Sequence, residues 1–200
     1  MEVSNKGEKM KNIMLDLETM GSGSNAAIVS IGAVLFDPLT GETGANFYQV
    51  VSLNSSAYYG ELDAGTVVWW MQQDDDARAV FKDKDKVSLR VALERFSQWI
   101  EDNCDKNEKD KPDAFVWGNG ATFDNVILGN AYKAVRLHQP WFFANDRDVR
   151  TIVDLGRQLR GIDPKKDLEL QGTAHNALDD AIFQVRYVSA IYQALGNHGI

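Results

Sequence analysis

The sequence Asn12-Ile-Met-Leu-Asp16-Leu-Glu18-Thr-Met20 places two carboxylates two residues apart at the end of an apolar run. Alternate residues of a β-strand point to the same face, so Asp16 and Glu18 can bind one divalent cation together. Two like charges beside a core destabilise a fold unless something neutralises them. The pair therefore indicates a metal site, although a solvated sheet edge would carry the same pattern.

The pattern around this stretch changes from strands to helices. We expect strands at 12–18, 26–36 and 46–53, separated by turns at 21–25 and 37–41, which predicts an antiparallel meander. The rest of the predicted elements are helices at 66–81, 87–100, 122–135, 148–159 and 176–195, a polar loop at 102–113 and a short buried strand at 114–117. This order predicts a mixed α/β sheet with helices on both faces.

The length of 200 residues suits a single domain. We expect a flexible, Lys-rich tail at 1–11 and one domain at 12–200. No apolar run approaches the roughly 20 residues that span a bilayer, and the tail lacks the apolar segment of a secretory signal. Cys104 is the only cysteine, which excludes an internal disulfide and suits the reducing cytoplasm.

The charge balance bears on the choice of partner. The 21 basic and 29 acidic residues give a net charge of −8. Because phosphate binding depends largely on Lys and Arg, this balance disfavours tight binding to long duplexes. A bound pair of divalent cations would reverse the local sign of the charge where a phosphate must lie. The charge therefore does not exclude a nucleic-acid partner.

A third carboxylate, Asp124, lies in the segment Trp117-Gly-Asn-Gly-Ala-Thr-Phe-Asp124, where a strand leads into a helix. Open α/β sheets place their sites at the carboxyl ends of strands, which makes Asp124 a candidate ligand. The alternative is a first-turn acid that complements the helix dipole, with Thr122 as the cap.

The last candidate segment, Thr173-Ala-His175-Asn-Ala-Leu-Asp-Asp180, opens the C-terminal helix. Asn176 and Asp179 have the spacing of a capping box, so we expect Asp179 to be structural and Asp180 to be free for another role. His175 precedes the helix, about one turn from that spare carboxylate, and histidine titrates near neutral pH. His175 is therefore a candidate general base.

Together, Asp16-Leu-Glu18-Thr, Phe123-Asp124, and His175 with Asp180 five residues later resemble the signature of the DEDDh class of 3′-to-5′ exonucleases. This DnaQ-like group belongs to the ribonuclease H-like superfamily, and the resemblance spans residues 12 to 195. The segments Trp69-Trp70-Met-Gln-Gln and 117–124 are similar to small phage-encoded and bacterial exonucleases, including the RNase AS type that trims adenylate-rich RNA. The resemblance implies a mixed five-stranded sheet of three antiparallel strands followed by parallel ones.

The resemblance also implies two-metal hydrolysis of phosphodiesters, which releases 5′-mononucleotides from the 3′ ends of single-stranded DNA or RNA. The two cations would be held by four carboxylates, namely Asp16, Glu18, Asp124 and Asp180, with Asp16 bridging both. Hard oxygen ligands favour Mg²⁺ or Mn²⁺. His175 would take the proton from the attacking water. No readable motif separates DNA from RNA.

Five residues are candidates for binding the substrate: Thr19, Met20, Trp70, Asn119 and Phe123. By the resemblance, Thr19 and Met20 contact the terminal nucleotide. Trp70 and Phe123 would stack on bases, a role for which the neighbouring Trp69 is less favoured. Asn119 would contact a sugar or a base. The alternative is packing at the strand end for Thr19 and Met20 and packing in the core for the aromatic residues. For Asn119 it is an ordinary Gly-Asn-Gly loop.

Two further charged segments have plain alternatives. Arg147 or Arg150 could position a phosphate, or could belong to a cluster of surface ion pairs. The run 74–76 of three aspartates lacks the spacing of a calcium loop and is expected to be a helix cap or a solvated helix face.

Two other functions compete with the exonuclease. A catalytically silent binding module on the same fold has no physical reason to keep four mutually repelling acids. An enzyme for strand transfer or internal cutting on the related fold would need no histidine just ahead of Asp180. Related enzymes are often homodimers in which one subunit supplies basic residues to the other's site, and an acidic chain with few basic clusters is compatible with a homodimer.

Overall fold

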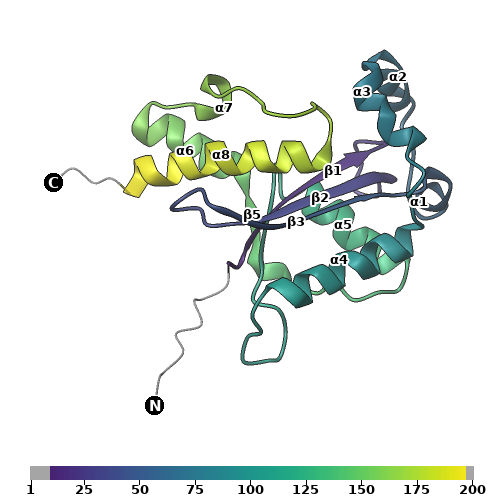
Figure 1. Cartoon of the computed structure of the whole chain (residues 1–200), viewed down its shortest axis with the longest axis horizontal. Coiled ribbons are helices and arrows are strands. Elements are labelled where there is room, and N and C mark those ends of the chain that lie inside the picture. Colours follow the sequence, from purple (N-terminus) through teal and green to yellow (C-terminus); the bar gives the residue numbers. More distant parts are fainter. Residues whose placement is uncertain (1–9, 197–200) are drawn as a thin grey trace.

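The structure, a computed structural model, describes residues 10–196, in which helices cover both faces of a central sheet (Figure 1). The strands are β1 (Asn12–Thr19), β2 (Ile28–Phe36), β3 (Thr43–Val50), β4 (Phe115–Gly118) and β5 (Asp146–Asp148), in the order β3-β2-β1-β4-β5. The pairs β1–β2 and β2–β3 are antiparallel, whereas β1–β4 and β4–β5 are parallel. The predicted mixed five-stranded sheet of the ribonuclease H-like class is confirmed.

The helices form two layers and a further group at one end of the sheet. They are α1 (Leu53–Tyr59), α2 (Ala64–Gln72), α3 (Asp75–Arg78), η1 (Ala79–Lys82), α4 (Leu89–Asn103), α5 (Asp124–Ala134), η2 (Phe143–Asn145), α6 (Val149–Arg160), α7 (Pro164–Asp167) and α8 (Ala177–Gly196). In Figure 1, α4 and α5 lie below the sheet, α6 and α8 lie above it, and α1 to α3 gather at one end. No helix within residues 10–196 is long and apolar enough to cross a membrane.

Strand β1 separates the two halves of the core. Ile13, Leu15 and Leu17 belong to the apolar cluster that includes residues of α4 and α5, whereas Met14 belongs to the cluster formed with α6 and α8. Because side chains alternate along a strand, the carboxylates at positions 16 and 18 lie on the same face as Met14. The acidic pair therefore faces α8.

Gly32 of β2 allows α8 to approach the sheet. Gly32 is paired with Asp16 in the sheet, and a Cβ atom at Gly32 would lie 2.2 Å from the carbonyl carbon of Ala177 and 2.3 Å from the nitrogen of Leu178. Both are backbone atoms of the first turn of α8, so no side chain could yield the space. The bare backbone at this position holds the N-terminus of α8 against the carboxylates of β1.

Several predicted boundaries were wrong for local reasons. The helix expected at 66–81 is broken after Gln72, because the Asp74 carboxylate accepts a hydrogen bond from the N–H of Ala77 and starts α3. This contact confirms a cap role for the 74–76 run. The third strand ends at Val50, and the unpredicted helix α1 begins at Leu53. Strand β5, read from the sequence as a charged cluster, has only three residues, too few for a periodic pattern.

Two residues of the predicted tail at 1–11, Met10 and Lys11, contact the rest of the domain. Residues 1–9 lie outside the described residues. Met10 packs against the core cluster below the sheet, and the carbonyl of Lys11 accepts a hydrogen bond from the N–H of Phe115. These contacts extend the pairing of β1 and β4 by one residue beyond the predicted start of the domain.

Candidate active site

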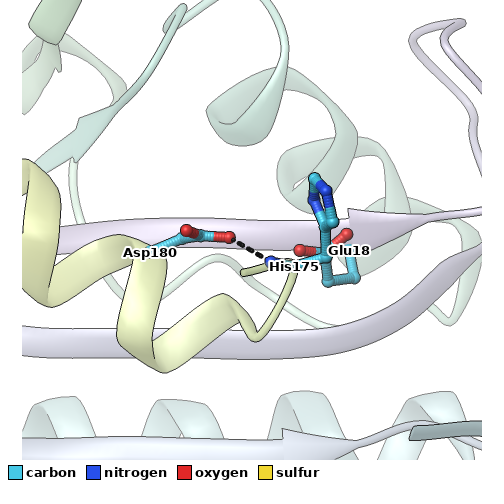
Figure 2. Close-up of side chains that lie close together, drawn as sticks. All are labelled: Glu18, His175 and Asp180. Carbon is cyan, nitrogen blue, oxygen red and sulfur yellow. Dashed lines mark hydrogen bonds between the residues drawn. The ribbon is translucent and has the colours of Figure 1, made fainter. Parts of the chain in front are cut away.

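Five predicted residues meet at the carboxyl end of β1. Asp16 and Glu18 come from β1, Asp124 from the first turn of α5, and Asp180 from the first turn of α8, with His175 in the loop before α8. Figure 2 shows His175 and Glu18 side by side with Asp180 close by, and one ligand atom from each of these three lies within 4.8 Å of the others.

Two of the carboxylates are held by hydrogen bonds from distant segments. The side-chain amide of Gln184, on α8, donates to Oδ1 of Asp16 at 2.7 Å. The backbone N–H of Leu17 donates to Oδ1 of Asp124 at 3.2 Å. Gly118 makes room for α5, because a Cβ atom there would lie 2.3 Å from Oδ1 of Asn125 and 3.0 Å from Cβ of Asp124. Asp16 and Asp124 are therefore fixed by the packing of α5 and α8 against the sheet.

The loop that carries His175 has a strained backbone. His175 has a φ of 63°, in the left-handed region that favours glycine. Its backbone N–H donates to Oδ2 of Asp180 at 3.0 Å, which Figure 2 marks with a dashed line. The imidazole ring lies edge-on to Trp69 at 4.8 Å between ring centroids, and 6.4 Å from Trp70. The imidazole lies beside Glu18 (Figure 2).

The electrostatics of the site disfavour four ionised carboxylates. Burial, and then the charges of Asp180 and Asp124, raise the pKa of Glu18 to about 8. Burial, and then the charge of Asp124, raise the pKa of Asp16 well above its usual range. Burial raises the pKa of Asp124 to about 7, opposed by the N–H of Leu17, and burial also raises the pKa of Asp180. The cluster is thus short of positive charge.

A divalent cation fits this deficit. Glu18 is 8% exposed and Asp124 is 2% exposed, so water alone does not compensate their charges. The ligand atoms are carboxylate oxygens with one imidazole nitrogen nearby, a donor set that suits Mg²⁺ or Mn²⁺. The four carboxylates of the site would hold the metal.

Thr19 and Met20, at the end of β1, are hydrogen-bonded within the protein. The hydroxyl of Thr19 donates to the carbonyl of Gly21 at 2.7 Å, and the N–H of Met20 donates to the carbonyl of Ala27. The Met20 carbonyl accepts a hydrogen bond from the N–H of Asp63. Both side chains are less than a tenth exposed. Packing at the strand end is therefore observed, and contact with a terminal nucleotide stays a prediction.

Burial reverses the expected order of the two tryptophans. Trp70 is 3% exposed, its ring packs edge-on to Phe81, and its indole N–H donates to the carbonyl of Thr19 at 2.9 Å. A base cannot stack on a ring enclosed in this way, so stacking by Trp70 is a wrong prediction in this structure. Trp69 is 38% exposed and lies against His175. Trp69, the less favoured of the two in the sequence, is the tryptophan that faces the site.

Asn119 and Phe123 flank the start of α5. Asn119 lines a hollow of about 250 Å³ that Asp16 and Asp180 also border. Phe123 is half-buried, precedes α5 and packs against the core cluster below the sheet. Asn119 is thus at the site, and stacking by Phe123 on a base stays a prediction.

The two arginines that could position a phosphate, Arg147 and Arg150, have different surroundings. The guanidinium of Arg147 donates to the carbonyls of Ala144 and Asp146 and lies over the ring of Phe115, so it is used in packing. Arg150 is exposed, and its Cζ would lie 3.0 Å from a Cβ atom at Gly120, beside the Asn119 loop.

The predicted capping box at the start of α8 is only half present. Asn176 accepts a hydrogen bond from the N–H of Asp179, as a cap should. The Asp179 carboxylate accepts from the N–H of Thr173 at 2.8 Å rather than from Asn176. Asp179 is structural, as predicted, but it ties down the loop that carries His175.

Two residues that the sequence did not indicate complete the site. Gln184 follows Asp180 by four residues, so both lie on one face of α8, and this spacing could have identified it. Gly32 has no local signal, because its role depends on how closely α8 approaches β2.

The sheet order, with an acidic pair on β1, acids on α5 and α8, and a histidine just before α8, agrees with the resemblance to the DEDDh class of 3′-to-5′ exonucleases. The comparison with known families agrees, because residues 11–192 match the 3′-5′ exoribonuclease Rv2179c-like domain. The chain belongs to this family and is a 3′-5′ exonuclease.

Relatives and solved structures support the class and the fold. An exodeoxyribonuclease of Enterobacteria phage T4 is 27% identical over 215 residues, covering 94% of this chain and 92% of that protein. Cell-death related nuclease 4 (CRN-4) has a TM-score of 0.66 at 17% identity and covers 96% of this chain, which spans 65% of CRN-4. The nuclease domain of 3′hExo, a DEDDh family member bound to rAMP, has a TM-score of 0.61 at 15% identity, covering 92% of each chain.

A further solved structure carries metal. Pop2p of S. pombe, in a form with Mg²⁺ and Mn²⁺ bound, has a TM-score of 0.60 at 12% identity and covers 91% of this chain and 82% of that one. In this chain, the cluster of Glu18, His175 and Asp180 could hold a metal ion.

Proposed function

We propose that this exonuclease removes nucleotides one at a time from the 3′ end of single-stranded RNA or DNA, releasing 5′-mononucleotides with two divalent cations and His175 as general base. The observation that carries the proposal is the convergence of four carboxylates with raised pKa values and one histidine on the same end of β1. A structural cluster would pair its acids with Lys or Arg, whereas this one calls for cations from solution.

The four carboxylates have distinct places in this proposal. The charges of Asp124, Glu18 and Asp180 all raise the pKa of Asp16, so the four acids act on one another. In this proposal Asp16 would hold two Mg²⁺ or Mn²⁺ ions, one together with Glu18 and Asp180 and the other together with Asp124. Such ions neutralise the phosphate and polarise its phosphorus–oxygen bonds.

In this proposal His175 would take a proton from a water near Glu18. Its ring is held edge-on by Trp69, and its backbone is tied to Asp180. Neither contact uses the side-chain carboxylate of Glu18, which can orient the water from the other side. One ligand atom from each of His175, Glu18 and Asp180 lies within 4.8 Å of the others, so the imidazole is close to the carboxylates proposed to hold the metal.

Single-stranded substrates suit the surroundings of the site. Trp69 is the exposed aromatic beside His175, and stacking on an aromatic face tolerates any base. A net charge of −8 gives little of the phosphate binding that long duplexes require. The family match is to an exoribonuclease domain and the T4 relative is an exodeoxyribonuclease, so the experiment must compare both sugars.

The proposal can be tested with 5′-labelled single-stranded RNA and DNA of matched sequence, including adenylate-rich 3′ tails. We expect a ladder that shortens from the 3′ end in Mg²⁺ or Mn²⁺ and stops in chelator, and the preferred sugar follows from the two rates. A 3′-phosphate block should stop the reaction. Cleavage that continues behind the block would show internal cutting, and no cleavage under any metal would favour the silent binding module.

Two expectations from the sequence are kept as proposals. A homodimer would be detected by sedimentation at concentrations used for the assay. A cytoplasmic location would be detected by imaging a tagged chain in cells.

A further inference from the structure

Two separate hollows lie along α8 near the active site. One, of about 280 Å³, includes His175 and Asn176, just before the helix begins. The other, of about 250 Å³, includes Asp16, Asn119 and Lys165, and we name it the Lys165 hollow. The α8 residues that line it, Asp180, Gln184 and Tyr187 among them, run from the first turn to the third. His175 and Lys165 therefore line different hollows, and Asp16 and Asp180 border the one that Lys165 lines.

The floor of the Lys165 hollow is polar and incompletely bonded. Tyr187 is 1% exposed and Gln184 is 4% exposed. Within residues 10–196, neither the Tyr187 hydroxyl nor Oε1 of Gln184 has a hydrogen-bond partner. Buried polar groups in proteins are nearly always bonded to something, so these two atoms suit a polar ligand. Of the described residues around this hollow, Lys165 alone carries a positive charge.

Lys165 is held in place by its short helix. Pro164 is buried, and the Asp163 carboxylate before it accepts a hydrogen bond from the guanidinium of Arg157 at 2.9 Å. The next residue, Lys166, lies 3.4 Å from the same carboxylate of Asp163 and does not line the hollow. Two adjacent lysines of α7 therefore face different surroundings, one toward the carboxylate cluster and one toward an ion pair.

The geometry of the reaction assigns the two hollows different roles. In phosphoryl transfer the attacking and leaving oxygens lie roughly in line on opposite sides of the phosphorus. If His175 deprotonates the water on its own side, the leaving oxygen departs away from His175, and the hollow that borders Asp16 and Asp180 without His175 is the one that we assign to it. In a 3′-to-5′ exonuclease that releases 5′-mononucleotides, the leaving oxygen is the 3′-oxygen of the shortened strand.

We propose that the Lys165 hollow holds the sugar-phosphate backbone of the strand being shortened, and that Lys165 binds the first phosphate beyond the leaving 3′-oxygen. This inference rests on the function proposed above. It makes Lys165 a residue for holding the strand, separate from the groups that act on the reacting atoms. Arg150, exposed beside Gly120, lies next to the Asn119 loop and would continue the path of positive charge.

The sharpest test uses two unlabelled substrates that differ by that one phosphate. A dinucleoside monophosphate has a leaving group with no phosphate, whereas the same dinucleotide with a 5′-phosphate carries it. Both contain one scissile bond, and products are separated by chromatography. The variants are Lys165→Gln and its matched control Lys166→Gln, which removes the same charge from the neighbouring position. Circular dichroism and melting curves confirm that each variant folds.

In the wild type, the 5′-phosphate should raise kcat/KM, and Lys165→Gln should remove about fivefold of that gain. Lys166→Gln should keep that gain and should cleave the unphosphorylated dinucleotide at nearly the wild-type rate. On a 12-mer, Lys165→Gln should lower the salt dependence of log KM by about 0.7, the value expected for one lost phosphate contact on a single strand.

Different outcomes separate the two proposals. If the wild type does not shorten any 3′ end, the proposed function fails before the lysines are compared. If the wild type is active and Lys165→Gln behaves as Lys166→Gln does, the inference is overturned. It is also overturned if Lys165→Gln slows both dinucleotides equally, because Lys165 would then act on the scissile phosphate.

Discussion

The two halves of the site are built differently. Asp16 and Asp124 are held by Gln184 and by the backbone of Leu17, groups that belong to the packed sheet and helices. Asp180 and His175 are joined to each other, and His175 adopts a left-handed backbone in a loop. The first half is rigid because the core fixes it, whereas the second depends on local contacts. We therefore expect the packed core to fix the positions of the carboxylates that hold the metal, and the loop to fix the position of the histidine that transfers the proton.

The largest expected effect comes from Asp16→Asn, which keeps the shape of the rigid half but removes its central charge. We expect kcat to fall by about 10⁴-fold or more, because the cations lose their shared ligand. The readout is the rate of 3′ shortening in Mg²⁺, with the exposed residue Asp154 of α6, changed to Asn, as the control. Near wild-type activity in Asp16→Asn would remove the proposed mechanism.

His175→Ala probes the loop half alone. We expect kcat to fall by about 10²- to 10⁴-fold, the usual contribution of a general base. Metal binding should be nearly unchanged, because His175 is not among the four carboxylate ligands. Titration of Mn²⁺ by calorimetry measures that binding beside the rate. Loss of Mn²⁺ affinity together with activity would mean that the histidine is itself a ligand.

The raised pKa values make the metal-free fold sensitive to alkali. Glu18 ionises near pH 4.5 in an unfolded chain and near pH 8 in the fold, so its contribution to stability is lost as pH rises between them. Asp124, with a pKa of about 7, acts in the same direction. In chelator, the melting temperature should be lower at pH 8.5 than at pH 6. Mg²⁺ should raise it more at pH 8.5, and an equal rise at both values would contradict the carboxylate site.

The smallest effect is expected for Asp179→Ala, which loosens the loop without touching the carboxylates. Loss of the hydrogen bond from Thr173 should cost about 1 kcal/mol in the free energy of unfolding. Activity should fall far less than in Asp180→Ala, as urea unfolding and kinetics on the same samples would show. If Asp179→Ala were inactive and Asp180→Ala active, the roles assigned to the two acids would have to be reversed.

The acidic pair of β1 was easier to predict from the sequence than its surroundings. Asp16 and Glu18 follow from strand alternation alone, a local rule that tertiary contacts did not override. Trp69 and Trp70 are neighbours on a helix of nine residues, where periodicity cannot tell which ring faces the core. The hydrogen bond from Trp70 to Thr19, 51 residues away, decides the matter.

The same limit applies to the helices around the site. The break between α2 and α3 depends on the Asp74 cap, which competes with an otherwise continuous helical pattern. The place of Lys165 depends on how the segment between α6 and α8 returns to the sheet, and no local pattern in the sequence encodes that path. These features depend on tertiary packing, which sequence motifs do not encode.

The bare backbone at Gly32 has a consequence for surveys of related sequences. A Cβ atom at this position would collide with the first turn of α8, so even alanine would push Asp180 and His175 away from β1. A homologue could then retain all five signature residues and still be an inactive protein. Position 32, which no catalytic motif includes, should accordingly be read together with the motif when an unknown sequence is judged to be a working nuclease.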